Sequence, residues 1–395
     1  MATTLTASEQ FRRLYQKKVR RERELAKELN RRAHTFFRKK HVVGFGVGSK
    51  HSQFAAIFYV TRKVANARLA AKDRLPRSVR VGNKRIPTDV VAVGRTTECA
   101  GPPIGDSNEN RKSYHIELAG DWKMGTQIRS FMPEPGGGGG SLLYTGTSGA
   151  RVIRVDKKGK PTGEPPLVLS CAHVLFYNKC EVAQAEKDRD PQPRPPGKDH
   201  NYVGDVLEVA DMSTADAGVF ECSGALREIM HIGDPKEPVT PTVGLYVQKS
   251  GRTTGLTWGK IAGTNITKKL DKKEAYDGKD HTYTGMFQIE NKCIQDPAGP
   301  GKLPPGENVP PNLFGWLGDS GSLIVAGKPN APGEFGDPVQ QKKYNDADDV
   351  EKGKIRQTYE RAALGLFCLK DTTYISGQEM ALALKALNIK LDVGP

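Results

Sequence analysis

Ser320 is the residue in this sequence best suited by its neighbours to act as a nucleophile. It has glycines close on both sides, at Gly318 and Gly321, and the apolar run 323–325 follows. A serine nucleophile needs a turn that presents its hydroxyl, with backbone N–H groups nearby to stabilise a developing oxyanion. Glycines permit such a turn because they lack a Cβ atom, and the apolar run predicts a buried strand that anchors it. Short strings of Gly, Asp and Ser also occur in ordinary turns, so a catalytic interpretation needs partners elsewhere in the chain.

Two upstream segments supply groups that could activate this hydroxyl. His173 follows the apolar stretch 167–169, and Asp216 opens the short apolar stretch 217–220. A histidine within hydrogen-bond distance takes the serine proton as a general base, while a carboxylate orients the imidazole and stabilises its charged form. We therefore predict that His173, Asp216 and Ser320 form a catalytic triad, in the chain order His, Asp, Ser.

Other residues are candidates for some of these roles. Asp205 and Asp211 are alternative third groups, but neither opens an apolar strand, and both are more simply explained as exposed loop charges. Asp319 is expected to stabilise the nucleophile turn rather than to act as a catalyst. The backbone N–H groups of Gly318 and Ser320 are predicted to form the oxyanion hole, where each donor is worth about 3 kcal/mol.

The three segments resemble those of chymotrypsin-like (trypsin-fold) serine proteases, and their order is the chymotrypsin order. The resemblance implies a mainly β protein with a double β-barrel protease domain, a protein or peptide substrate and no cofactor. A narrower resemblance is to the intracellular bacterial and plant trypsin-like group that includes the plant Narrow Leaf protein. It is carried by VVGxGVG at 42–48, TDVV at 88–91, GTxGA at 146–150, SxxHV at 170–174, DA at 216–217, KxGRTTGLT at 249–257 and GDSGS at 318–322. The chain departs from that group at Gly218, where a second alanine is usual.

The resemblance also indicates which residues would bind a substrate side chain. Phe314 lies six residues before Ser320, where trypsin has the aspartate of its pocket floor, so cleavage after Arg or Lys is not expected. Lys370 follows the apolar stretch 364–369 and is predicted to line the mouth of the pocket, where it would favour an acidic or small side chain.

The basic residues are concentrated near the N-terminus. The 395 residues include 60 Lys and Arg against 45 Asp and Glu, and the first forty contain thirteen of these basic residues against four Glu. Such an excess could bind nucleic acid, an anionic lipid or an acidic partner, although a solvated helix face is the commoner explanation. No apolar run is long enough to span a membrane, and no secretory signal is recognisable, so a cytoplasmic protein is expected.

The remaining composition indicates neither a metal site nor a disulfide framework. The six cysteines form no Cys-x-x-Cys pair, so this pattern favours free buried thiols over disulfides. The histidines lack the spacing of a zinc site, so no metal and no cofactor are predicted.

Four regions are predicted along the chain. They are a basic amphipathic helix at 1–40, a small α/β module at 41–95, a linker rich in Gly and Pro at 96–140, and a trypsin-like protease domain at 141–395. The helix has an apolar stripe at three- and four-residue steps, and either the body of the chain or a second copy could cover it. A homo-oligomer formed through this helix is therefore one interpretation.

The sequence favours an intracellular serine endopeptidase that is latent until a partner or signal activates it. The alternative is a catalytically silent trypsin-fold scaffold that binds a partner or nucleic acid through its basic N-terminal region, because a fold does not guarantee an activity. Nucleic-acid binding alone has less support, since no pattern of base-stacking aromatic residues accompanies the basic residues.

Overall fold

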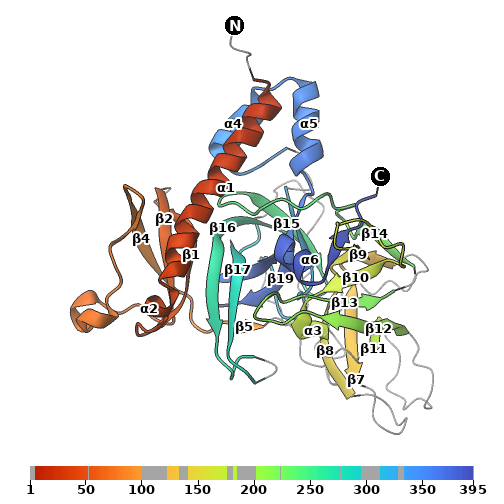
Figure 1. Ribbon diagram of the computed structural model, residues 1–395, viewed down its shortest axis with the longest axis horizontal. Helices are drawn as coiled ribbons and strands as arrows, with labels where there is room; N and C mark the ends of the chain where they lie inside the picture. The colour runs from red at the N-terminus through yellow and green to blue at the C-terminus, as the bar shows by residue number, and fades with distance from the viewer. Residues whose placement is uncertain are drawn as a thin grey trace.

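A computed structural model describes residues 5–51, 53–98, 122–132, 141–175, 181–184, 202–222, 224–275, 278–294, 312–327 and 333–394. Most of the ordered structure is β (Figure 1), in one sheet of eleven strands, one of eight and one of two. None of the helices in the described part of the chain is both long enough and apolar enough to cross a membrane.

Six antiparallel strands of the largest sheet close into a barrel. Their order is β15, β18, β19, β20, β17 and β16, and β16 pairs again with β15 through a tight hairpin that joins Gly251 to Gly255. The strands are β15 (Tyr246–Gly251), β16 (Gly255–Leu270), β17 (His281–Glu290), β18 (Leu323–Ala326), β19 (Ala363–Lys370) and β20 (Tyr374–Glu379), with β5 (Thr97–Glu98) added beside β19.

The N-terminal strands extend this same sheet. β16 is 16 residues long, so it continues past the barrel and pairs with β1. β1, β2, β4 and β3 then follow in that order, away from the barrel on the left of Figure 1. Their bounds are β1 (Val42–Lys50), β2 (Gln53–Val60), β3 (Ser78–Val81) and β4 (Lys84–Ala92), with two short 3-10 turns at Asn66–Arg68 and Ala71–Asp73.

The second large sheet runs in the order β21, β9, β10, β13, β12, β11, β7 and β8. Its strand β10 is buried along its whole length, which explains the continuous apolar run in the sequence. The elements are β7 (Gln127–Met132), β8 (Ser141–Thr147), β9 (Ala150–Arg154), β10 (Leu167–Ser170), β11 (Glu181–Gln184), β12 (Tyr202–Val209), β13 (Gly218–Glu221) and β21 (Ile389–Leu391), while β6 (Trp122–Met124) pairs with β14 (Ala225–Ile229) and α3 (Ala172–Leu175) follows β10.

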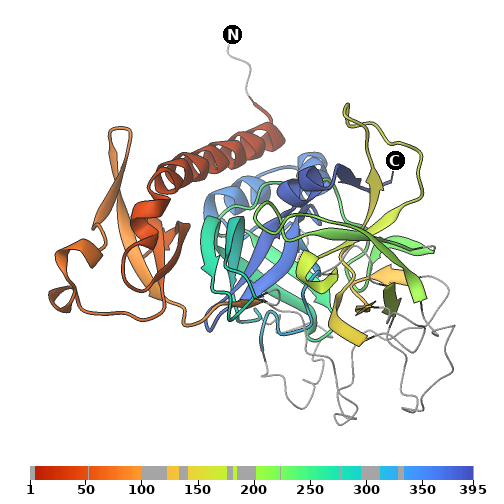
Figure 2. The same ribbon diagram turned by 60° about the horizontal axis from the view of Figure 1, so that its bottom comes forward.

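The long helix α1 (Ala7–Arg31) lies along the barrel and continues into α2 (Ala33–Phe37), as Figures 1 and 2 show. Thr6 begins α1 with a capping box, in which its hydroxyl accepts from Glu9 N while its own N–H donates to the Glu9 carboxylate. The apolar stripe packs against the body of the chain, and the Phe11 ring lies 4.9 Å from that of Phe335. Self-association through this helix stays a prediction.

Three further helices come from the C-terminal third of the chain: α4 (Pro338–Asn345), α5 (Asp349–Tyr359) and α6 (Met380–Ala386). α4 and α5 contact α1, so these two helices form part of the surface against which the N-terminal helix packs. Buried residues from both large sheets, such as Val219 of β13 and Leu366 of β19, belong to one apolar cluster that joins them.

The predicted linker at 96–140 requires correction for its described residues. β5, β6 and β7 all lie within it, and β7 pairs with both β8 and β11. The physical reason is apolar burial, because Trp122, Met124 and Ile128 are part of the main core. The glycine run 136–140 lies outside the described residues. The other predicted divisions stay predictions, although β1 to β4 share a sheet with the barrel.

Candidate active site

His173 is held at the junction between the two large sheets. It lies in α3, directly after β10, and its side chain is fully buried. Ser170, the last residue of β10, donates its hydroxyl to the carbonyl of Thr147 at 2.9 Å. This contact fixes the end of the strand from which the histidine segment turns, so the imidazole has little freedom to move.

The structure brings the three predicted catalytic side chains together. His173 Nδ1 lies 2.7 Å from Asp216 Oδ2, and His173 Nε2 lies 2.8 Å from Ser320 Oγ. The His173 backbone N–H also donates to Asp216 Oδ1 at 3.1 Å, so both carboxylate oxygens face the histidine. The alternative carboxylate Asp211 instead accepts the N–H of Ser213 in a local turn, and Asp205 lies in β12.

The electrostatics of this chain of hydrogen bonds favour an ion pair between the histidine and the carboxylate. Burial by itself would lower the pKa of His173, but the charge and hydrogen bond of Asp216 outweigh it, and the pKa is raised. Burial would also raise the pKa of Asp216, yet contacts with His173 lower it overall. Asp216 therefore stays ionised and is suited to stabilise a protonated imidazole.

The turn that carries Ser320 has the shape that its glycines predict. Gly318 and Gly321 have φ values of +92° and +93°, in the left-handed region that favours glycine. The turn is tied to β8, because Thr147 N donates to Ser320 O at 2.8 Å and Thr147 Oγ1 donates to Gly318 O at 2.9 Å. These bonds fix the backbone on both sides of Asp319.

The N–H groups of this turn divide into two sets. Those of Asp319, Gly321 and Ser322 donate to backbone carbonyls. Within the part of the chain that the structure describes, we find no acceptor bound to the N–H groups of Gly318 and Ser320. These two are the donors predicted for the oxyanion hole, and their availability is consistent with that role.

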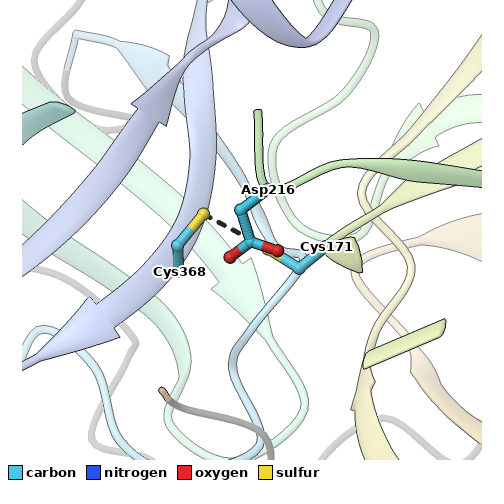
Figure 3. A group of neighbouring side chains, drawn as sticks. All are labelled: Cys171, Asp216 and Cys368. Atoms are coloured by element: carbon cyan, nitrogen blue, oxygen red, sulfur yellow. Dashed lines mark hydrogen bonds between the residues drawn. The ribbon is translucent and has the colours of Figure 1, made fainter. Parts of the chain in front are cut away.

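Two thiols lie beside the triad carboxylate. The sulfurs of Cys171 and Cys368 are 3.3 Å apart, and Figure 3 shows Asp216 next to them. In the described part of the chain, Cys171, Asp216 and Cys368 are the side chains whose possible metal-ligand atoms all lie within 4.8 Å of one another. Burial raises the pKa of both thiols, and Asp216 is already bound to His173, so a metal could bind here only by disrupting the triad.

The two predicted pocket residues lie in different surroundings. Phe314 is fully buried in the barrel core, and its ring centroid is 5.6 Å from Lys249 Nζ. Lys370 and Leu317 line a hollow of about 520 Å³, where Lys370 Nζ lies 3.5 Å from the centroid of the Trp316 ring. Lys370 is therefore near the nucleophile turn, whereas Phe314 packs beneath it. Their roles in substrate binding stay predictions.

Lys249 and Thr147 also contact the nucleophile turn, although neither is predicted from the sequence as part of the site. The signal for Lys249 was present, because it is the charged first residue of the KxGRTTGLT motif. The signal for Thr147 was weaker, since a threonine in a strand is ordinary.

No family model matches the sequence, and no curated protein sequence matches it. Solved structures do resemble the chain, at low identity. One, described as a glutamic acid-specific serine protease that uses a histidine triad in substrate binding, has 15% identity and a TM-score of 0.37, covering 68% of this chain and 98% of its own. The Nocardiopsis protease NAPase has 12% identity and a TM-score of 0.38 over 69% and 98%. The Cellulomonas bogoriensis chymotrypsin has 13% identity and a TM-score of 0.36 over 69% and 100%.

The predicted mainly β class with an N-terminal helix is confirmed by the structure itself. Values this low transfer neither substrate nor residue roles from those proteins, so the function has to come from the contacts of this chain.

Proposed function

We propose that this chain is an intracellular serine endopeptidase in which Ser320 is the nucleophile, His173 the general base and acid, and Asp216 the orienting carboxylate. The observation that carries the proposal is one continuous chain of hydrogen bonds, 2.7 Å from Asp216 to His173 and 2.8 Å from His173 to Ser320. Chance rarely aligns a carboxylate, an imidazole and a hydroxyl in this order at a buried junction. The motif resemblance supports the intracellular trypsin-like group as its family.

The reaction follows from the positions of these groups. Ser320 Oγ attacks the scissile carbonyl carbon while His173 Nε2 takes its proton, and the resulting oxyanion accepts hydrogen bonds from the N–H groups of Gly318 and Ser320. His173 then gives the proton to the leaving amine as the C–N bond breaks. Water attacks the acyl-enzyme by the same route in reverse and restores the Ser320 hydroxyl.

The burial of the triad supports a latent form of the enzyme. His173, Asp216 and Ser320 all have 0% exposure, so a polypeptide substrate cannot reach the hydroxyl without a movement of the surrounding chain. Opening would then be the step that a partner or signal controls.

The preferred substrate side chain follows from the two pocket residues. Phe314 provides no negative charge for an Arg or Lys side chain, and the Lys370 ammonium beside the nucleophile turn favours an acidic or small one. A peptide library would show this preference directly, and a strong preference for Arg or Lys would contradict it.

The decisive comparison is between the full-length protein and its Ser320→Ala variant, incubated with an unfolded protein and with the peptide library. Cleavage by the wild type alone supports the endopeptidase. Labelling of the wild type alone by a small fluorophosphonate, without cleavage, supports the latent form. If neither protein cleaves or is labelled, while both retain nucleic acid or a partner in a salt-dependent manner, the silent scaffold is favoured instead.

A further inference from the structure

The short strand β5 lies beside the end of β19 (Figure 1), on the edge that carries the nucleophile turn. β19 pairs with β20 along one edge. Its other edge pairs first with β18, up to Leu366. Thr97 and Glu98 of β5 then pair with residues 369–370 in antiparallel register. β5 therefore covers the last stretch of the edge on which β18 begins.

Ser320 lies between β18 and β5 along this edge. Its Oγ is 3.4 Å from the carbonyl oxygen of Cys368. Glu98 lies opposite Leu369, which is one position further along β19. Because β5 is antiparallel to β19, the chain of β5 runs toward Ser320.

A polypeptide substrate needs the same place. An extended peptide binds to a sheet edge by adding a strand, and its main-chain groups supply the hydrogen bonds. Antiparallel pairing is the more stable arrangement, and here it places the residues that precede the scissile bond along β19 beyond Cys368. β5 lies at that place and has the direction that such a substrate requires. A substrate strand cannot pair with β19 while β5 is there.

The side chain of Glu98 fills a buried position near the triad. It is 2% exposed, and its Oε1 accepts the hydroxyl of Tyr283, on β17, at 2.6 Å. Burial, followed by the charges of Asp216 and Glu98, raises the pKa of Tyr283, so this hydroxyl keeps its proton and acts as a donor. Burial lowers the pKa of His173, whereas the charge of Asp216 and, less strongly, that of Glu98 raise it. The Glu98 carboxylate is therefore close enough to influence the imidazole.

The surroundings of Glu98 suit a negative charge. Glu98 and Lys370 line the same hollow of about 520 Å³. Two other carboxylates line it, and both are paired with basic side chains, Glu274 with Arg95 at 3.4 Å and Asp371 with a buried lysine. Departure of β5 would take one negative charge out of this hollow, and an acidic side chain of a substrate would replace it.

We propose that β5 is an internal substrate mimic: it occupies the place of the substrate strand beside Ser320, and Glu98 fills a subsite in which Tyr283 receives an acidic side chain. The substrate is then an extended polypeptide with Asp or Glu as the second residue before the scissile bond, the position opposite Leu369. β5 has to leave before this substrate binds, so it is the inhibitory element of the latent form. The catalytic consequences rest on the proposed protease function, but the occupation of the edge does not.

β5 can be displaced because it is only two residues long. Its pairing with β19 supplies few hydrogen bonds, so a longer strand can compete with it. The chain just before β5 is fixed at Val93, whose carbonyl accepts the N–H of Thr372 at 3.2 Å and its hydroxyl at 2.9 Å. Val93 N also donates to the carbonyl of Val60, in β2, at 2.9 Å. A movement of β1 to β4 away from the barrel would therefore withdraw β5.

The test compares the full-length wild type with Glu98→Ala and Glu274→Ala. Both variants remove one carboxylate from the same hollow, but only Glu98 belongs to β5. Cleavage of fluorescein-labelled casein requires the substrate edge, whereas labelling by a small fluorophosphonate requires only the triad. For Glu98→Ala we expect the ratio of cleavage to labelling to rise by about 10-fold or more, because the state with an open edge becomes the major one. For Glu274→Ala we expect the wild-type ratio.

A peptide library cleaved by Glu98→Ala tests the subsite. Peptides with Glu as the second residue before the scissile bond should be cleaved about 10-fold faster than the same peptides with Gln, a difference typical of a charge-assisted hydrogen bond. Adding Tyr283→Phe removes the donor but keeps the ring, and should abolish the difference. Equal cleavage of the Glu and Gln peptides by Glu98→Ala would contradict the subsite.

Tyr283→Phe alone covers the case in which Glu98→Ala does not fold. It removes the hydrogen bond to Glu98 and leaves β5 otherwise intact, so the ratio of cleavage to labelling should also rise. An unchanged ratio in a folded Tyr283→Phe protein that is labelled would overturn the mimic and leave the protease standing. An equal rise in Glu274→Ala would do the same, because the charge of the hollow and not β5 would then limit access.

A binding measurement decides the case in which the wild type is never labelled, which would contradict the protease. A fluorescein-labelled peptide with the sequence of residues 93–98 is added to Ser320→Ala and to Ser320→Ala combined with Glu98→Ala, and its fluorescence polarisation is followed. We expect saturable binding to the double variant alone, since β5 occupies the edge in the single variant. This result would support the mimic without any catalysis, and no binding to the double variant would overturn it.

Discussion

His173 Nε2 and Ser320 Oγ lie 2.8 Å apart although 147 residues separate them in the chain. The two residues come from different sheets, since His173 follows β10 and Ser320 precedes β18. Folding of both sheets against one another is therefore required before the hydroxyl meets its base. Any change that separates the sheets should abolish labelling of Ser320 even if each sheet keeps its own strands.

The reactivity of Ser320 towards a small fluorophosphonate should depend on pH. Asp216 raises the pKa of His173 above its ordinary value of 6.5 despite burial, and only the neutral imidazole can accept the serine proton. The fluorophosphonate labelling rate should therefore rise with pH and reach its half-maximum above pH 6.5. A half-maximum below that value would show that Asp216 does not stabilise the imidazolium.

The same raised pKa predicts a pH dependence of stability with the opposite sign. A histidine whose pKa is higher in the folded state binds its proton more tightly there. Its stabilising contribution to the free energy of unfolding is therefore fully present below pH 6.5. That contribution is lost as pH rises through the folded-state pKa. Thermal unfolding of wild type and His173→Ala across this range should show the two curves converging at higher pH, and parallel curves would refute the linkage.

The carboxylate can be tested with a matched pair of variants. Asp216→Asn keeps the size and shape of the side chain but removes its negative charge. The amide also favours the wrong tautomer of His173, so the labelling of Ser320 should slow by about 10⁴-fold. Asp211→Asn alters only a local turn with Ser213 and should leave the labelling rate unchanged. If instead Asp211→Asn caused the larger loss, the assignment of the third group would be wrong.

Gly318 should tolerate no side chain. Its φ is +92°, and a Cβ atom there would lie 2.6 Å from Thr253 Oγ1 and 2.9 Å from Arg252 Nη1. Gly318→Ala should therefore displace an oxyanion donor and slow labelling by about 100-fold. Gly82→Ala is the control, because its φ is +56° and nothing lies within 4 Å of the added atom. It should cost about 1 kcal/mol of stability from backbone strain alone and leave the labelling rate unchanged.

The docking of α1 should depend on pH through Glu22. This buried side chain accepts from Thr264 Oγ1 at 2.7 Å and Val243 N at 3.2 Å, and burial raises its pKa to about 7. A carboxyl whose pKa is raised on folding takes up a proton, so the wild type loses stability as pH rises from 4.5 to about 7. Glu22→Gln should be more stable than wild type above pH 7, by roughly 1–3 kcal/mol.

The control for this prediction is Glu24→Gln on the exposed face of the same helix. Chemical denaturation at several pH values measures both variants. We expect the advantage of Glu22→Gln to grow with pH up to about 7 and Glu24→Gln to follow the wild type. An advantage that does not vary with pH would contradict the role of the buried carboxyl.

Much of the candidate site could be predicted because each of its residues lies beside a pattern that is visible in the local sequence. His173, Asp216 and Ser320 each adjoin a short apolar strand, and a run of buried residues is visible without knowledge of the fold. The stripe of α1 was visible for the same reason. The contact between Lys249 and Asp319 was not, because 70 positions separate the two residues and a charged residue in a motif does not by itself identify its partner.

The sequence was least informative where an element depends on its tertiary partner. Helices α4 and α5 carry few buried residues, and they pack against α1, which lies more than 300 residues earlier in the chain. Likewise β7 lies in the predicted linker, since six residues next to a glycine run give little periodicity. The pairing of β1 with β16 joins segments more than 200 residues apart, a separation that no local pattern encodes.

The most direct test of the triad is peptide mapping after reaction of the folded full-length protein with diisopropyl fluorophosphate, a reagent small enough to enter an enclosed site. We expect one adduct, on Ser320, which is absent when His173 is replaced by alanine or when the protein is first denatured. An unmodified Ser320, or an adduct that forms equally well in His173→Ala, would contradict it.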